Sequence, residues 1–270
     1  MGTTMRLAIH RLLAASVGTL CRHPRCVRIL TYHSVQDHPD RQRHQDPRRF
    51  EQQIRYLAEH GYESFRVRDL VHRWPDILTE APAVVLTFDD GYSNNRTIVC
   101  EILRAYGMTA TFFVVSGAIG EKRRPPESPM LAGYSDIEML SWSDLADMME
   151  EGFEIGSHSH SHALLAALDR ASAAEEIQRS RQQLEQQLGH PVCSFAYPKG
   201  HGDAFSDDTR QLLLEAGFRA ACTMIVNRLT RRADLMQLPR IGILPSDDLT
   251  QFRRKLLGHY DVLPLLGIGR

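Results

Sequence analysis

The chain has 270 residues, of which 43% are hydrophobic, and its formal net charge at pH 7 is -1. This length and composition allow a full hydrophobic core in one α/β domain, and they exclude a chain that is disordered over most of its length. A nearly neutral chain lacks the basic surface that draws proteins to a phosphate backbone, so we expect no nucleic-acid partner. Five widely spaced cysteines without a C-x-x-C pair indicate neither a disulfide framework nor a thiolate zinc site.

Residues 1–27 form a basic segment without acidic residues, in which Ile9, Leu12 and Val17 recur at helical spacing. The pattern predicts an amphipathic helix, and its apolar run is too short to span a membrane. We favour packing of this helix on the outside of the following domain, residues 28–270, over peripheral contact with a membrane. A signal peptide is a third interpretation, although no clear cleavage site follows the apolar stretch. The location therefore stays open between the cytoplasm, a membrane surface and export.

From residue 28 onward, strand-like and helical segments alternate without repeats. The predicted strands are residues 28–35, 83–88, 109–115, 153–158, 192–198 and 219–224. The predicted helices are residues 46–60, 94–106, 142–151, 169–188 and 208–216. Such alternation indicates a parallel sheet, open or closed into a barrel, with functional residues at the carboxyl ends of its strands. Residues 116–140 are rich in glycine, proline and charge, which predicts a long surface loop bordering a substrate groove.

Two adjacent aspartates end one of the apolar strands, in the stretch VVLTFDDGYSNN. Successive side chains at a strand end point in different directions, so one of Asp89 and Asp90 can meet a metal while the other meets a substrate or water. The alternative is a simple Asp-Gly turn that closes the strand. Taken alone, the pair favours the turn, and the rest of the chain decides between the two.

Three histidines alternate with serines at the end of another predicted strand, in EIGSHSHSHALL. In an extended chain His158 and His162 would lie roughly 13 Å apart, too far to share one ion. If the chain forms a helical turn just after His158, the two side chains become neighbours at about 6 Å. We favour a shared metal over a merely polar loop, because imidazole is the commonest metal-ligating side chain.

Together these segments offer two imidazole nitrogens and one carboxylate, with a coordination position left over. Three protein ligands plus water are typical of a catalytic rather than a structural zinc ion. The second aspartate is then free to act as a base.

The ordered motifs resemble those of the polysaccharide deacetylases, the NodB-homology or carbohydrate esterase family 4 domain. TFDDG is similar to the first motif of that family, the segment from His158 to His162 to the second, and FAYPKG, residues 195–200, to the third. The resemblance runs from about residue 28 to residue 243. It implies an α/β fold with a deformed (β/α)7-type barrel, and metal-dependent removal of acetyl groups from the N-acetylated sugars of a polysaccharide or other glycan.

The resemblance also implies roles for individual residues. Asp89 is the expected general base, while Asp90, His158 and His162 are the expected metal ligands. The expected metal is Zn2+, with Co2+ or Ni2+ as alternatives, and water activated by it is the expected nucleophile. The implied partner is an acetylated glycan substrate.

Two departures from the family pattern concern residues near the base and the acid. An arginine common in the third motif is replaced by Ala196, and no late histidine occurs in LPRIGILPS, where the general acid is usual. A subgroup acting on exopolysaccharides such as poly-N-acetylglucosamine takes its acid from an early Tyr-His strand, which TYHSV resembles. His33 is therefore the expected acid, with a buried core histidine as the alternative. Arg240 is the candidate replacement for the arginine, pairing with Asp89, with an ordinary surface salt bridge as the alternative.

The tetrahedral oxyanion of the reaction needs hydrogen-bond donors in addition to the metal. We expect a backbone N–H near Lys199 in the segment that contains Tyr197 and Pro198, since Pro198 has no N–H to donate. Tyr197 and Trp142 are candidates for stacking on sugar rings, with ordinary packing as the alternative.

Two other function classes stay open on the residues alone. Two histidines and one carboxylate also suit a non-haem iron oxygenase, although the second aspartate then has no role. A carbohydrate-binding relative with weak or no activity is suggested by Ala196 and the missing late histidine. The sequence does not name the glycan, nor does it separate N- from O-deacetylation.

Overall fold

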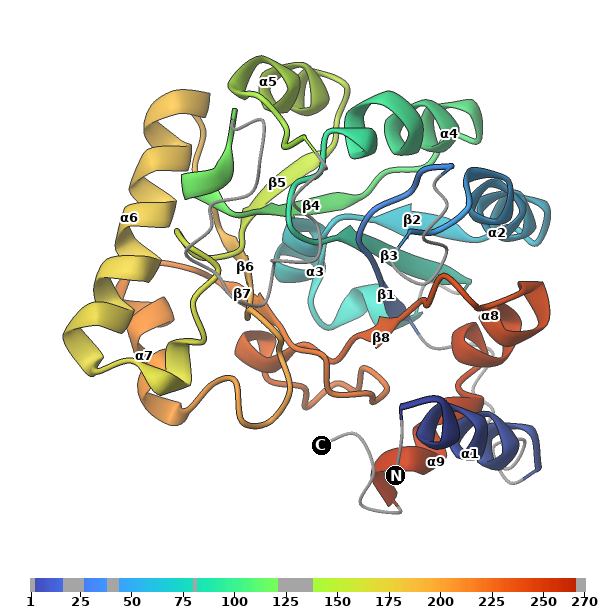
Figure 1. The fold of residues 1–270 in the computed structure, drawn as a ribbon. Coiled ribbons are helices and arrows are strands. Elements are labelled where there is room, and N and C mark those ends of the chain that lie inside the picture. Colours follow the sequence, from blue (N-terminus) through green and yellow to red (C-terminus); the bar gives the residue numbers. More distant parts are fainter. Residues whose placement is uncertain (1–2, 17–26, 38–43, 80–81, 121–137, 266–270) are drawn as a thin grey trace.

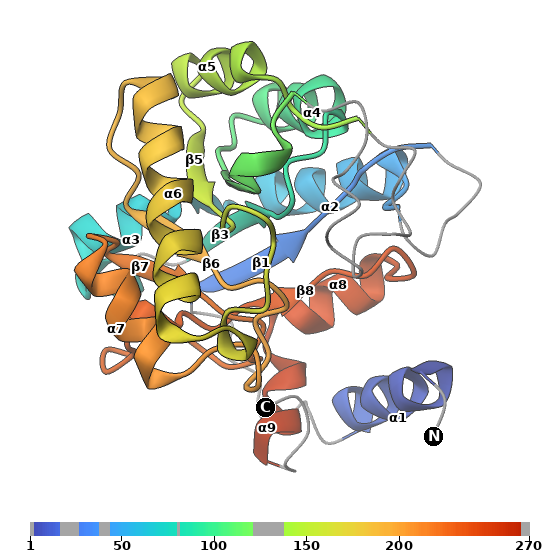
Figure 2. The ribbon, with the colours of Figure 1, turned by 60° about the vertical axis from the view of Figure 1, so that its left-hand side comes forward.

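The computed structural model describes residues 3–16, 27–37, 44–79, 82–120 and 138–265. These residues form a curled parallel sheet with helices around its outside, so that the sheet makes a half-barrel (Figures 1 and 2). The predicted deformed (β/α)7-type barrel is thereby confirmed. Residues 121–137, most of the predicted loop at 116–140, lie outside the described residues.

Seven strands follow one another across the sheet in the order β7-β6-β5-β4-β3-β1-β8, and β2 pairs with β3 beside this path. Their bounds are β1 Arg28–Tyr32, β2 Glu63–Phe65, β3 Ala83–Phe88, β4 Thr111–Val114, β5 Glu154–Ser157, β6 Ser194–Ala196, β7 Ala220–Cys222 and β8 Ile241–Gly242. Every pair is parallel, so the carboxyl ends of all strands meet at one rim of the half-barrel. The strand ends at which we expected the functional residues therefore lie along the same rim.

Residues 238–242 connect the two edges of the curled sheet. The Leu238 N–H donates to the Ala221 carbonyl at 2.8 Å, which joins this segment to β7. Gly242 pairs with Thr31 of β1 at the other edge. The segment thus narrows the opening of the half-barrel, and it carries Arg240 between the two attachments.

The helices surround the sheet (Figure 1). Their bounds are α1 Thr3–Ser16, α2 Pro47–Glu59, α3 Val67–Arg73, α4 Cys100–Ala105, α5 Trp142–Glu150, α6 Arg170–Leu188, α7 Asp207–Glu215, α8 Leu249–Leu256 and α9 Val262–Leu265. The single helix predicted at residues 94–106 begins as a π-helical turn, Asn95–Val99, before α4. No helix in the described ranges is long and apolar enough to cross a membrane.

Side chains alternate between the two faces of the central strands. On the face toward the helices, Phe88 stacks between Tyr32 and Phe112, with ring centroids 5.3 and 5.0 Å away. On the inner face, the Thr31 and Thr87 hydroxyls lie 3.1 Å apart. The stacked rings of Tyr32, Phe88 and Phe112 therefore hold β1, β3 and β4 side by side. The threonine hydroxyls lie inside the half-barrel, just below the rim.

Helix α1 packs on the C-terminal helices, in contact with α8 and α9. Ala14 is buried, and Arg11 forms a 3.0 Å ion pair with Asp247. Leu12 keeps 67% of its surface exposed. The predicted helix is present in the described part of residues 1–27, and its contacts are those of a helix that covers the domain.

Candidate active site

Asp89 and Asp90 leave the carboxyl end of β3 in different directions. The Asp89 N–H continues the sheet by donating to the Tyr32 carbonyl at 3.0 Å. Asp90 and Gly91 then both adopt left-handed backbone, with φ of 80° and 82°. Such a conformation costs a non-glycine residue about 1–3 kcal/mol and is concentrated at functional sites. The strained turn separates the two carboxylates, so each has its own surroundings.

His158 and His162 follow β5 and approach each other closely, with ring centroids 4.8 Å apart. The predicted helical turn is wrong, because Ser159 and His162 adopt left-handed backbone, with φ of 63° and 62°. A sharp bend between these two residues brings the imidazoles together. Left-handed φ at non-glycine residues depends on tertiary contacts, so local sequence periodicity could not reveal it.

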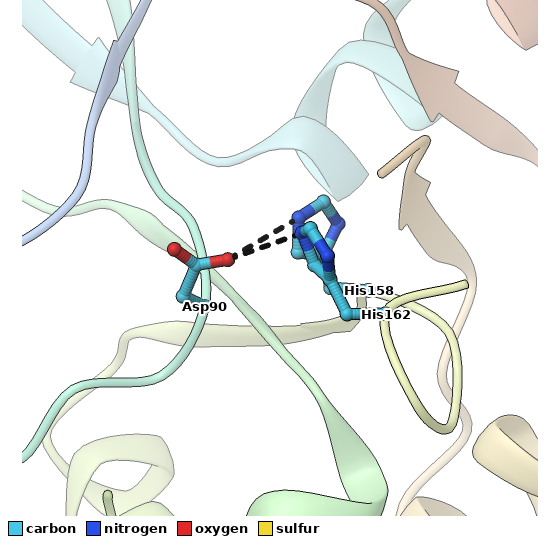
Figure 3. Close-up of side chains that lie close together, drawn as sticks. All are labelled: Asp90, His158 and His162. Carbon is cyan, nitrogen blue, oxygen red and sulfur yellow. Dashed lines mark ion pairs between the residues drawn. The ribbon is translucent and has the colours of Figure 1, made fainter. Parts of the chain in front are cut away.

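The carboxylate of Asp90 faces both imidazoles (Figure 3). Its Oδ1 lies 3.6 Å from His158 Nε2 and 3.4 Å from His162 Nε2. All three side chains are buried, and their donor atoms lie within 4.8 Å of one another. Two imidazole nitrogens and one carboxylate oxygen suit a Zn2+ ion, so the residues present fit the predicted metal.

Neighbouring groups orient the three candidate ligands. His158 Nδ1 donates to the Ala196 carbonyl at 2.7 Å, which leaves Nε2 deprotonated toward Asp90. Burial lowers the pKa of His158, against the raising effects of Asp89 and Asp90, and keeps the ring neutral as a ligand requires. Asp90 Oδ2 accepts a 2.9 Å hydrogen bond from the Tyr92 hydroxyl, so Oδ1 is the oxygen turned to the histidines.

Asp89 forms a buried, bidentate ion pair with Arg240. The two oxygens accept from Arg240 Nη1 at 2.7 Å and Nη2 at 2.8 Å, and Arg240 Nε donates to the Thr223 carbonyl at 3.0 Å. Burial raises the pKa of Asp89, but the charge and hydrogen bonds of Arg240 outweigh it and hold the pKa below its usual range. Since Arg240 is only 1% exposed, the alternative of a surface salt bridge is wrong.

The chain is similar to one known protein family over a continuous stretch that includes the ends of β3 and β5. The model of the family described as polysaccharide deacetylase matches residues 77–221, more than half of the chain. The chain belongs to the polysaccharide deacetylase family. It is therefore a carbohydrate deacetylase, a hydrolase.

Named relatives are similar over most of this deacetylase. The putative polysaccharide deacetylase YxkH of Bacillus subtilis (strain 168) is 23% identical over 219 residues, which cover 81% of this chain and 71% of that protein. The poly-beta-1,6-N-acetyl-D-glucosamine N-deacetylase of Staphylococcus aureus (strain MSSA476) is 24% identical over 208 residues, which cover 74% of this chain and 67% of that protein.

Solved structures share the fold of this deacetylase. The Streptococcus pyogenes deacetylase PplD in complex with acetate matches with a TM-score of 0.73 at 22% identity, covering 87% of this chain and 99% of that one. IcaB from Ammonifex degensii matches with a TM-score of 0.69 at 22% identity, covering 87% and 97%. These likenesses support the half-barrel architecture.

The other predicted residues of the deacetylase lie at the same rim but differ in exposure. His33 follows β1 and is exposed, so the alternative of a buried core histidine is wrong. Among the charges that lower the pKa of Asp89, that of His33 contributes least, after Arg240 and His158. Lys199 is exposed and adopts left-handed backbone, with φ of 62°. In the described part of the chain, no acceptor takes the Lys199 N–H. Pro198 is buried beside it.

The two aromatic residues considered for sugar stacking are packed into the protein. Tyr197 is fully buried, stacks on Phe205 at 4.6 Å between centroids, and donates its hydroxyl to the Met236 carbonyl at 3.1 Å. Trp142 is half-buried and packs against the core. Tyr197 therefore packs inside the protein, and its ring has no exposed face on which a sugar could stack.

The sequence analysis missed several residues that hold the site together. Glu176 of α6 accepts from the N–H groups of His160 and Ser161, at 3.1 and 2.9 Å, and from the Ser161 hydroxyl at 2.8 Å. His160 itself is no ligand in this arrangement, because its Nδ1 contacts the Ser116 hydroxyl at 2.9 Å. Tyr92, two residues after Asp90 in the quoted motif, was the only one of these with a signal in the sequence.

Proposed function

We propose that the chain is a metal-dependent deacetylase that hydrolyses the acetamido groups of N-acetylated sugars in a polysaccharide. One observation carries the proposal: the donor atoms of Asp90, His158 and His162 converge. Beside them, Asp89 is kept ionised by Arg240 without being drawn into the cluster. This hydrolysis needs one carboxylate that binds the metal and a second one that accepts a proton.

Asp90, His158 and His162 would hold a divalent ion, which we propose is Zn2+, with Co2+ or Ni2+ as substitutes. When bound, such an ion supplies Lewis-acid polarisation of the acetyl carbonyl and a water of lowered pKa. Neutral His158, with Nε2 presented by the Ala196 carbonyl, supports this ligand set.

The remaining steps belong to the residues of the chain. Asp89 accepts the proton of the attacking water, and Arg240 keeps that carboxylate ionised and correctly oriented. The Lys199 N–H is our candidate donor to the oxyanion. His33, exposed at the rim, donates a proton to the leaving sugar amine. Asp89, His33 and Lys199 each follow the carboxyl end of a strand, whereas Arg240 precedes β8.

The substrate that we propose is an exopolysaccharide of N-acetylglucosamine. The similar protein from Staphylococcus aureus is named for poly-beta-1,6-N-acetyl-D-glucosamine, which supports this class. We place the reaction in the cytoplasm or at a membrane surface, with export also open. The contacts of α1 with α8 and α9 favour a covering helix over a membrane contact for residues 1–27.

Acetate release and metal content, measured on the same preparations, test the proposal. The unaltered chain, stripped with a chelator and reloaded with Zn2+, Co2+ or Ni2+, should release acetate from oligomers of N-acetylglucosamine. Asp89→Asn should lower kcat by about 10²–10⁴-fold, the usual contribution of a general base, while metal content stays unchanged. His162→Ala should lose both metal and acetate release.

Two results would contradict the proposal in different ways. Metal binding without acetate release from any acetylated glycan would support a carbohydrate-binding relative. Oxygen consumption with bound iron would support an oxygenase. Ala196, which motivated the first of these alternatives, no longer favours it, because Arg240 reaches Asp89 from another segment.

A further inference from the structure

His33, the candidate acid, and Asp89, the candidate base, leave neighbouring strands of the sheet. Strands β1 and β3 are parallel, and their last residues in register are Tyr32 and Phe88. The hydrogen bond from the Asp89 N–H to the Tyr32 carbonyl, at 3.0 Å, continues this pairing past the end of β3. His33 is exposed just beyond it. The position of the His33 side chain therefore depends on what holds the residues that follow it.

Asn94 joins the two segments again beyond this bond. Its carboxamide oxygen accepts from the Val35 N–H at 3.3 Å, and its nitrogen donates to the Ser34 hydroxyl at 2.7 Å and to the Gln36 side chain at 3.3 Å. Because a backbone N–H can only donate, the oxygen of the carboxamide faces Val35 and the nitrogen faces Ser34. One buried side chain thus forms hydrogen bonds with three consecutive residues after His33.

The place of Asn94 in the chain makes this use of its side chain unusual. Asn94 is the N-cap of the π-helical turn Asn95–Val99, and an asparagine at an N-cap normally accepts from the first N–H groups of its own helix. Within the described residues, the Asn94 side chain forms no such cap hydrogen bond. Short π-helical turns are frequent at functional sites. The carboxamide therefore binds the segment after His33 rather than the helix that it precedes.

We propose that Asn94 is a positioning residue that fixes His33 for proton donation to the leaving sugar amine. The inference rests on the proposed function. In that step the His33 proton passes to the amine nitrogen as the carbon–nitrogen bond breaks, and the bonding electron pair stays on that nitrogen. Asn94 follows Asp89 and Asp90 closely in the chain, so it ties the acid to the segment that carries the base. A displacement of about 1 Å can cost about 10²-fold in rate, so the spacing between acid and base has to be fixed.

A double-mutant cycle of Asn94 and His33 tests this inference. Asn94→Leu keeps nearly the shape of the side chain and removes its hydrogen bonds. We expect it to lower kcat for acetate release from N-acetylglucosamine oligomers about 10- to 100-fold, with KM nearly constant. In the His33→Ala chain, the same substitution should lower the remaining kcat by less than about twofold, because a residue that acts through His33 has no effect once His33 is absent.

An activated ester, which needs no acid, supplies a second readout. The oxygen of an electron-poor phenyl acetate leaves without being protonated, so Asn94→Leu should hydrolyse this ester at nearly the rate of the unaltered chain. Bound Zn2+ should also stay unchanged, since Asn94 is not among the candidate ligands. Ser34→Ala is a milder variant that removes only the acceptor of the 2.7 Å hydrogen bond. It should lower kcat less than Asn94→Leu does, and again only while His33 is present.

Asn95→Leu is the matched control for Asn94→Leu. This neighbour is fully buried, and in the described part of the chain neither its carboxamide oxygen nor its nitrogen has a hydrogen-bond partner. Removal of an unpaired buried amide should leave kcat unchanged and keep or raise the thermal midpoint. Asn94→Leu removes paired groups and should lower the midpoint, so its kcat is measured at a temperature where the variant is fully folded.

Three outcomes would overturn the inference. Losses of kcat that multiply in the double variant would show that Asn94 acts independently of His33. An equal fall for the amide and ester substrates, together with lost Zn2+, would assign Asn94 a structural role. Unchanged kcat in both Asn94→Leu and Ser34→Ala would show that other contacts hold His33. These results come from a chain that releases acetate, whereas an unaltered chain that releases none contradicts the proposed function itself.

Discussion

The Asp89–Arg240 pair is the residue-level feature on which proton transfer depends. Both side chains are buried, and two parallel hydrogen bonds join the guanidinium to the carboxylate. A pair of this kind contributes little net stability compared with apolar side chains, yet removal of one partner leaves a buried charge and costs about 3–5 kcal/mol. Its presence is therefore better explained by the orientation and ionisation of Asp89 than by stability.

Arg240→Met should lower the free energy of unfolding by about 3–5 kcal/mol and lower kcat, while KM for the glycan stays nearly constant. Arg240→Lys should restore part of the activity, since lysine keeps the charge but not the bidentate geometry. Denaturant unfolding and steady-state kinetics measure both effects.

The double variant Asp89→Leu with Arg240→Met is the control for that experiment. It removes both charges, so stability should return toward that of the unaltered chain while acetate release stays absent. If Arg240→Met alone kept full kcat, Arg240 would have no positioning role.

For individual residues, the sequence predicted which side chains belong to the site better than it predicted what those side chains contact. Asp89, Asp90, His158 and His162 were recognisable because each follows a strand whose carboxyl end reaches the same rim. The buried state of Tyr197 was not recognisable, because burial depends on which distant segments cover a side chain. Arg240 lies 151 positions from Asp89, and only the resemblance pointed to it.

Among the elements, the bend between β5 and α6 sets the distance between the two candidate metal ligands. Glu176 holds it from α6 by accepting two backbone N–H groups and one hydroxyl, whereas the bend has no regular secondary structure of its own. Such supporting contacts orient ligands, and their loss typically weakens metal binding by about 10–100-fold.

Glu176→Ala should accordingly weaken Zn2+ binding by about 10–100-fold, because the backbone at residues 160 and 161 loses its acceptor. Glu175→Ala is the matched control, since this neighbour on α6 is exposed and, within the described residues, forms no hydrogen bond to the bend. Competition with a chromogenic chelator measures the affinity of both variants. Equal affinities would show that the bend is held by other contacts.

The elements that the sequence analysis missed are short or strongly dependent on their neighbours. Strands β2 and β8 contain three and two residues, too few for a periodic pattern. Helices α3 and α8 have seven and eight residues, and they were absent from the prediction although α8 has basic residues in its last turn. The longer strands and helices were predicted because their apolar residues extend over more than one repeat of the strand or helix.

For the whole molecule, Glu154 connects several layers beneath the site. Its carboxylate accepts from the Ser194 and Thr111 hydroxyls, each at 2.7 Å, and from the Arg68 N–H at 3.0 Å. Burial raises the pKa of Glu154, against these hydrogen bonds and the charge of Arg68. The folded protein therefore binds more protons than the unfolded chain just above pH 4.5, and stability falls as pH rises through that window.

Glu154→Gln should raise the thermal midpoint at pH 7, because it removes the cost of burying a carboxylate, by about 2–4 °C for each kcal/mol regained. Near pH 4 the difference should shrink, because the carboxyl is then protonated in the folded state. Scanning calorimetry across this range measures it, with the exposed Glu63→Gln as control. A lower midpoint at pH 7 would mean that hydrogen bonding to the carboxylate outweighs its burial.

The segment at residues 238–242 links catalysis to the integrity of the curled sheet. It attaches to β7 and β1 at its two ends, and the guanidinium that steadies the base projects from its middle. Any excursion that detaches this short stretch separates the arginine from the carboxylate even while every helix stays folded. We therefore expect detachment of these five residues to inactivate the protein on heating before its helices unfold.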